Sequence, residues 1–109
     1  MTGSGTWRLR RYVESDGSEP FTDWLNGLDT TIQRRVRVAL SRIEAGNLSA
    51  VKWIDRNLGE YRMDTGPGYR IYLTRHGKDE LVLLNGGDKH SQSSDIADAK
   101  SYIVMLKKL

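Results

Sequence analysis

Apolar residues recur at two different spacings along the chain, and the spacing changes near its middle. Over residues 29–45 they fall every three or four positions, which predicts a helix with one buried face. The residues of that face are Ile32, Val36, Ala39, Leu40 and Ile43. Asp29 is suited to cap this helix, and Gly46 is suited to end it. Pro20, followed by apolar residues on one side, predicts a shorter helix over residues 20–28.

From residue 58 onward the apolar residues alternate with polar ones, which is typical of strands. Strands are predicted at about 58–64, 69–76 and 80–85, and the turn between the first two contains Gly66, Pro67 and Gly68. The last of these strands includes an unbroken apolar run, Leu81–Leu84. Such a run favours a central strand with both faces covered.

Two further elements are predicted at the ends of the chain. Residues 6–14 indicate a first strand, and residues from about 92 to 108 indicate a final helix. The resulting order, β-α-α-β-β-β-α, predicts an α+β fold in which helices pack against a small, mostly antiparallel, twisted sheet. We expect a single domain over residues 1–109, with residues 1–5 as a flexible tail.

The hairpin formed by the second and third predicted strands can be given a register from its pattern alone. The apolar residues that must share a face are Tyr61, Met63, Tyr69, Ile71 and Leu73. A shift of one residue reverses every side chain of a strand, so one register satisfies this condition. It sets Met63 opposite Tyr69, and it sets Arg62 opposite Arg70 on the other face.

The facing arginines have two interpretations, because like charges that oppose each other destabilise a sheet unless a carboxylate or a ligand lies between them. Glu60 and Asp64 share that face, and they would give a salt-bridged outer surface. The alternative is an anion site in which the two guanidinium groups hold a phosphate. The pattern alone leaves both open.

A second polar cluster, Gly87–Asp88–Lys89–His90, follows the central strand and precedes the last helix. Free backbone amides at a helix start favour negative charge, and Lys89 adds a cation there. Histidine can exchange protons near neutral pH, so His90 is a candidate for acid–base chemistry. The simpler alternatives are an ordinary turn and a surface histidine.

The polar side of the predicted long helix contains several arginines. They are Arg34, Arg35, Arg37 and Arg42. The simplest interpretation is a solvated helix face. The alternative is a docking surface for a partner or for phosphate.

Composition narrows the class of protein. The 109 residues have a net charge of +3 and include no cysteine. The lack of cysteine excludes a zinc ribbon and a thiol nucleophile, and it favours a reducing cytoplasm. No apolar run approaches the length that crosses a bilayer. Two separated histidines give little support for a metal site, so neither a metal nor another cofactor is expected.

Four segments along the chain, taken together, suggest a family. They are PFTDWLNGL, RIEAGNLSAVKWI, EYRMDTGPGYRIYL and LLNGGDKHSQSSDIADAK. Together they resemble the phage-derived killer-protein branch of the RelE/HigB/ParE toxin superfamily, whose members belong to addiction modules. The resemblance implies a compact sheet with helices packed on one face.

The resemblance also implies a function and a set of partners. Toxins of type II toxin–antitoxin modules in this superfamily are usually metal-independent, ribosome-dependent endoribonucleases that cleave mRNA and arrest translation. The implied partners are a helix-turn-helix antitoxin, the ribosome and mRNA. DNA is expected to be contacted only through the antitoxin complex, and no membrane is expected to be involved.

The same resemblance assigns candidate site residues. Arg62 and Arg70 would stabilise the crowded phosphorane, while Lys89 and His90 stand where relatives place active-site residues near the C-terminus. Lys52 matches a basic loop before the hairpin. The candidate substrate contacts are Lys52, Asp64 and Tyr72. The general base stays open among His90, Glu60 and Asp64.

Two other functions stay open on the same scaffold. ParE-like members inhibit DNA gyrase by binding it and have no nuclease chemistry. A non-catalytic binding module that acts as a co-repressor with its antitoxin would need the polar face and no catalytic groups.

Overall fold

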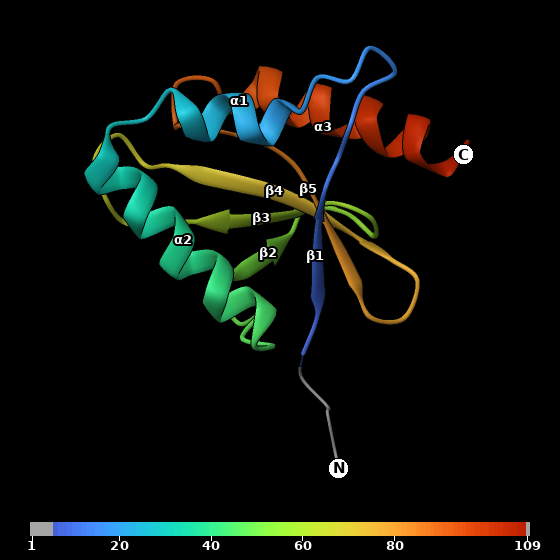
Figure 1. The fold of residues 1–109 in the computed structure, drawn as a ribbon, viewed down its shortest axis with the longest axis horizontal. Helices are drawn as coiled ribbons and strands as arrows, with labels where there is room; N and C mark the ends of the chain where they lie inside the picture. The colour runs from blue at the N-terminus through green and yellow to red at the C-terminus, as the bar shows by residue number, and fades with distance from the viewer. Residues whose placement is uncertain (1–5, 109) are drawn as a thin grey trace.

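The computed structural model describes residues 6–108, which form an α+β fold (Figure 1). Its elements are β1 (Arg8–Arg11), α1 (Pro20–Asn26), α2 (Thr30–Glu44), β2 (Val51–Trp53), β3 (Gly59–Arg62), β4 (Arg70–His76), β5 (Glu80–Gly87) and α3 (Gln92–Lys107). The predicted elements are all present, with β2 as an additional strand. The predicted flexible tail, residues 1–5, lies outside the described residues.

The five strands form one mixed sheet in the order β1-β5-β4-β3-β2. β1 runs parallel to β5, whereas the other three pairings are antiparallel. β5 lies between β1 and β4, and its run Leu81–Leu84 is almost wholly buried, as the apolar pattern predicts. The sheet is therefore mostly antiparallel, with one parallel edge.

β2 is the strand that the sequence pattern does not predict. Its residues pair with Gly59, Glu60 and Tyr61 of β3. Three residues are too few to show an alternating pattern, so Lys52 is expected in a loop. The structure corrects this expectation, because Lys52 lies in β2 directly opposite Glu60.

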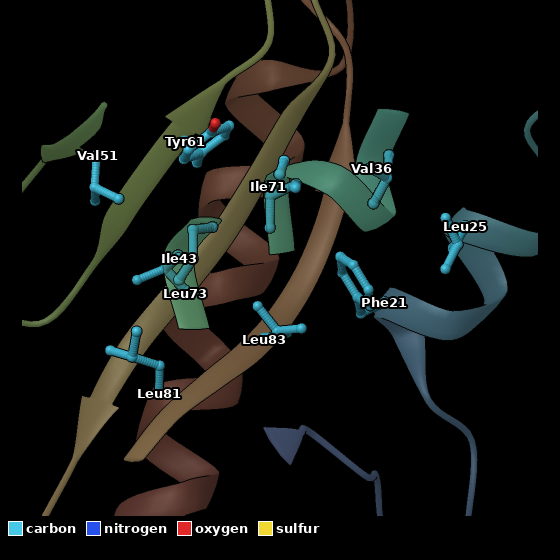
Figure 2. Packing of buried hydrophobic residues seen from close by; sticks show 11 residues of the cluster. Phe21, Leu25, Val36, Ile43, Val51, Tyr61, Ile71, Leu73, Leu81 and Leu83 are labelled. Atoms are coloured by element: carbon cyan, nitrogen blue, oxygen red, sulfur yellow. The ribbon is translucent and has the colours of Figure 1, made fainter. Parts of the chain in front are cut away.

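Helices cover both faces of the sheet, which corrects the expectation that they pack on one face. Phe21 of α1 and Val36 of α2 belong to a cluster with Leu83 of β5, part of which is seen in Figure 2. Ile103 of α3 belongs to a second cluster with Leu84. Successive residues of a strand point to opposite faces, so the continuous apolar run of β5 requires a cover on each side.

The predicted register of the hairpin is confirmed. Arg62 pairs with Arg70 across β3 and β4, and the backbone N–H of Met63 donates to the carbonyl of Tyr69 at 2.9 Å. Met63 and Tyr69 are half-buried on the α1–α2 side. The two arginines share the face that α3 covers, so this face is not an open outer surface.

The long helix α2 begins and ends as its sequence predicts. The Asp29 carboxylate accepts hydrogen bonds from the backbone N–H groups of Thr31 and Ile32. After the helix, Gly46 has a φ of 97°, a conformation that favours glycine. Within residues 6–108, no helix is both long enough and apolar enough to cross a membrane.

Candidate functional site

A buried carboxylate, Glu60, organises the face of the sheet that α3 covers. Only 1% of Glu60 is exposed. The register of β3 and β4 sets Tyr72 opposite it, and the Tyr72 hydroxyl donates to Oε2 at 3.1 Å. The start of α3 brings the amide of Gln92 to the same oxygen at 2.8 Å. Arg62 Nε donates to Oε1 at 2.9 Å. We call Glu60, Arg62, Arg70, Tyr72 and Gln92 the Glu60 cluster.

Arg70 is the most buried cation of the Glu60 cluster. It is 7% exposed, and its Nε lies 3.5 Å from Glu60 Oε2, within ion-pair distance. Its Nη1 donates to the carbonyl of Gly68 at 3.3 Å, which ties the guanidinium to the β3–β4 turn. A buried guanidinium is stable only beside an opposite charge, so the Glu60 carboxylate is what permits an arginine at this position.

Arg62 differs from Arg70 in its exposure. Its side chain is 49% exposed, and within the described chain its side-chain hydrogen bonding uses only Nε. The carboxylate between the two arginines removes the like-charge conflict that their register creates. Glu60 therefore provides the salt bridge considered from the sequence, whereas Asp64 is exposed and makes no ion pair within residues 6–108.

The protonation states in the Glu60 cluster follow from burial and hydrogen bonds. Burial alone would raise the pKa of Glu60, but hydrogen bonds from Arg62, Gln92 and Tyr72, together with the Arg62 charge, lower it below its ordinary value. Burial, followed by the Glu60 charge, raises the pKa of the Tyr72 hydroxyl far above its ordinary value. Glu60 is thus a stable anion with a low proton affinity, and Tyr72 is a neutral donor.

Lys89 lies beside the arginine pair. Its backbone N–H donates to the carbonyl of Pro67 at 3.2 Å, which holds the β5–α3 loop against the β3–β4 turn. A Cβ placed on Gly68 would lie 3.6 Å from Lys89 Cβ and 3.8 Å from Arg70 Nη1. The side chain of Lys89 is exposed, so its ammonium group is free to reach a ligand over this end of the sheet.

The other predicted site residues occupy more varied positions. His90 is exposed, and its backbone N–H donates to Asp88 Oδ1 at 2.8 Å. Lys52 is exposed and shares the Glu60 face through the β2–β3 register. Asp64 follows β3 and is exposed. Tyr72 has no exposed surface, so in this structure it contacts Glu60 and is not open to a substrate.

The start of α3 is filled by the protein's own acidic side chains. Asp88 Oδ1 accepts hydrogen bonds from the backbone N–H groups of His90 and Ser91, and the Ser91 hydroxyl donates to Asp95. A Cβ on Gly87 would lie 1.7 Å from Asp95 Oδ2, so a larger residue at this position would force the Asp95 side chain to move. Burial, with repulsion from Asp98 and Asp88, raises the pKa of Asp95. The helix start expected to attract phosphate already holds negative groups, so the cations of the hairpin are the better anion site.

Gln92 is the cluster member that sequence reasoning missed. It donates to a carboxylate 32 positions earlier in the chain. The sequence predicts Glu60 as a salt-bridge partner of the arginines on an outer face and as one possible base, because nothing in an alternating pattern distinguishes a buried carboxylate from an exposed one. The sequence signal that could have identified the contact between Glu60 and Tyr72 is the hairpin register, which sets these two residues opposite each other. Within residues 6–108, no three metal-binding side chains gather in a metal-binding arrangement.

Comparison with known proteins places the chain in a family. Residues 23–102 match the model of the family described as phage derived protein Gp49-like (DUF891). The chain is also 35% identical to an uncharacterized protein of Haemophilus influenzae over 81 residues, which is 73% of this chain and 82% of that protein. The matched region includes α2, the whole hairpin and most of α3. This protein belongs to the Gp49-like family of phage-derived proteins.

Proposed function

We propose that this protein is the toxin of a type II toxin–antitoxin module, and that it acts as a metal-independent, ribosome-dependent endoribonuclease that cleaves mRNA. Membership of a phage-derived family agrees with a toxin role in general terms. The proposal goes further, to the RelE/HigB/ParE superfamily and to a nuclease reaction, on the basis of the sequence resemblance and the Glu60 cluster.

One observation supports the chemistry above all. Arg62, Arg70 and Lys89 lie at one end of the sheet, where a buried anion forms ion pairs with the two guanidinium groups. Cleavage of RNA through its 2′-hydroxyl group passes through a phosphorane with additional negative charge. Cations that are already in place stabilise that charge without having to reorganise during the reaction.

The residues of the Glu60 cluster, together with Lys89, then have distinct roles. Arg62 and Lys89 are exposed and would contact the phosphate oxygens, because their terminal nitrogens can reach solvent. Arg70 is buried and would act through its charge and by bracing the β3–β4 turn. Tyr72 and Gln92 would orient Glu60. This role replaces the direct substrate contact that the sequence predicts for Tyr72.

The protonation states of the Glu60 cluster reduce the number of candidates for the general base. Glu60 has a lowered pKa, and its oxygens already accept hydrogen bonds, so it is poorly suited to remove a proton from the ribose. His90 and Asp64 are both exposed at the same end of the sheet and stay as the two candidates. Lys52, also exposed on this face, is proposed as a contact to a neighbouring phosphate.

The proposal is tested by expressing the protein in a pulse and mapping the 5′ ends of a translated message by primer extension. We expect new ends within codons of the translated message, and none in the same message with its start codon removed. The Arg62→Ala and Lys89→Ala variants should abolish both the cuts and the growth arrest. Lys78→Ala is the matched control, because Lys78 is an exposed cation in the turn at the opposite end of β4.

Other outcomes would contradict the nuclease proposal. DNA damage that precedes any loss of translation would favour the ParE-like gyrase inhibitor. Growth without arrest, together with repression of an operator in the presence of the antitoxin, would favour the co-repressor module.

A further inference from the structure

A groove of about 680 Å³ lies between α2 and the end of β3, on the face opposite α3. α2 packs on the sheet through Val36, Ala39 and Ile43. The groove runs along the side of α2 that is nearer to β3. In Figure 1, α2 runs alongside the half of the sheet that contains β3 and β2. The groove lies on the other face of the sheet from Glu60, and two residues of the nuclease proposal, Arg62 and Asp64, also border it.

The α2 wall of the groove is strongly basic. Arg34, Arg35 and Arg42 line it, and α2 contains no acidic residue before Glu44 at its last position. Within residues 6–108, none of the three forms an ion pair; Arg35 donates to the Thr65 hydroxyl at 3.4 Å. Asp64 is the carboxylate among the lining residues, so the groove has a clear excess of positive charge.

The groove also offers apolar surface beside the arginines. Val38 of α2 is 47% exposed, and the opposite wall is lined by Tyr61 of β3 and by Met63, which directly follows that strand. An RNA strand would use the arginines through its phosphates and would leave these apolar groups uncovered. A protein segment with both carboxylates and apolar side chains would use the two kinds of surface together.

We propose that this groove binds a segment of a partner protein in which apolar side chains are flanked by acidic ones. The apolar side chains pack on Val38, Met63 and Tyr61, and the carboxylates pair with Arg34 and Arg42. The inference goes beyond the nuclease proposal and does not depend on it.

The test is selection of a display library of random 12-residue peptides on the immobilised protein. We expect enrichment of peptides that contain both carboxylates and apolar side chains. Their binding should weaken about tenfold or more in the Arg34→Glu/Arg42→Glu double variant and in Val38→Asp. Arg37→Glu is the matched control, because Arg37 is exposed on α2 but does not line the groove. Its affinity should change less than threefold.

Circular dichroism and unfolding curves establish that each variant is folded before its affinity is measured. The inference is overturned if no acidic–apolar sequence is enriched, or if the enriched peptides bind the groove variants and the wild type equally. A single-stranded 12-nucleotide RNA that loses affinity in the groove variants, while the selected peptides do not, would assign the groove to nucleic acid. None of these outcomes depends on mRNA cleavage, so the two proposals fail separately.

Discussion

Removal of the Glu60 carboxylate is the sharpest test of how this site is built. Glu60→Ala leaves the Arg70 guanidinium, which is 7% exposed, without its partner charge, and it removes the acceptor for Tyr72 and Gln92. Breaking a buried ion pair from one side costs about 3–5 kcal/mol, because the remaining charge stays buried. A domain of this size has a total free energy of unfolding of about 5–15 kcal/mol. The variant should therefore lose a large part of its free energy of unfolding.

The measurement is the free energy of unfolding from urea denaturation, followed by tryptophan fluorescence at neutral pH. Glu60→Gln is the matched comparison, because it keeps the shape of the side chain and one acceptor oxygen, while it removes the charge and replaces the other oxygen by an NH2 donor. We expect it to lose about 1–3 kcal/mol, less than Glu60→Ala. A loss below about 1 kcal/mol in folded Glu60→Ala would show that Arg70 does not depend on the carboxylate, and the description of the site would be wrong.

Three further predictions concern pH and packing. The pKa of Glu60 is lowered in the folded protein. Its contribution to stability is therefore present above about pH 4.3 and is lost as the pH falls further. Because Glu60→Gln lacks this carboxylate, its unfolding free energy should fall less steeply with decreasing pH than that of the wild type. The pKa of Asp95 is raised in the folded protein, so the wild type loses stability as the pH rises through that pKa. Asp95→Asn has no such loss. Its unfolding free energy relative to that of the wild type should therefore increase from pH 3.5 to pH 7. Equal slopes for wild type and variant would contradict either statement. Gly87→Ala should destabilise by about 1–3 kcal/mol because its Cβ would meet Asp95, whereas Gly27→Ala, whose Cβ makes ordinary contacts of 3.5 Å and longer, should change stability by less than about 1 kcal/mol.

The parts of the structure that the sequence predicts depend on local, repeated patterns. α2 follows from its apolar spacing and from Asp29, because a helix needs one buried stripe and a partner for its first N–H groups. The hairpin register follows because a shift by one residue would expose every apolar side chain of a strand. The opposition of Arg62 and Arg70 was predictable for this reason alone.

The parts that the sequence does not predict depend on contacts between distant segments. β2 is too short to show a pattern, and the covering of both faces requires knowing where α3 packs. The hydrogen bond from Gln92 to Glu60 joins residues far apart in sequence, and no local signal marks either as a member of a buried cluster. The sequence joins Lys89 to the arginines only through the family resemblance, whereas in the structure the hydrogen bond from its backbone N–H to the Pro67 carbonyl holds it beside their turn.

The central claim is that Arg62 and Lys89 act together on one phosphate of ribosome-held mRNA. The most direct measurement is the rate of cleavage of a defined message in a reconstituted translation system, for the wild type and for Arg62→Ala, Lys89→Ala and Lys78→Ala. Loss of one donor aimed at the developing charge should slow cleavage about 100- to 1,000-fold, with the Lys78→Ala rate unchanged. No cleavage by the wild type on translating ribosomes, or wild-type rates in folded Arg62→Ala and Lys89→Ala, would contradict the claim.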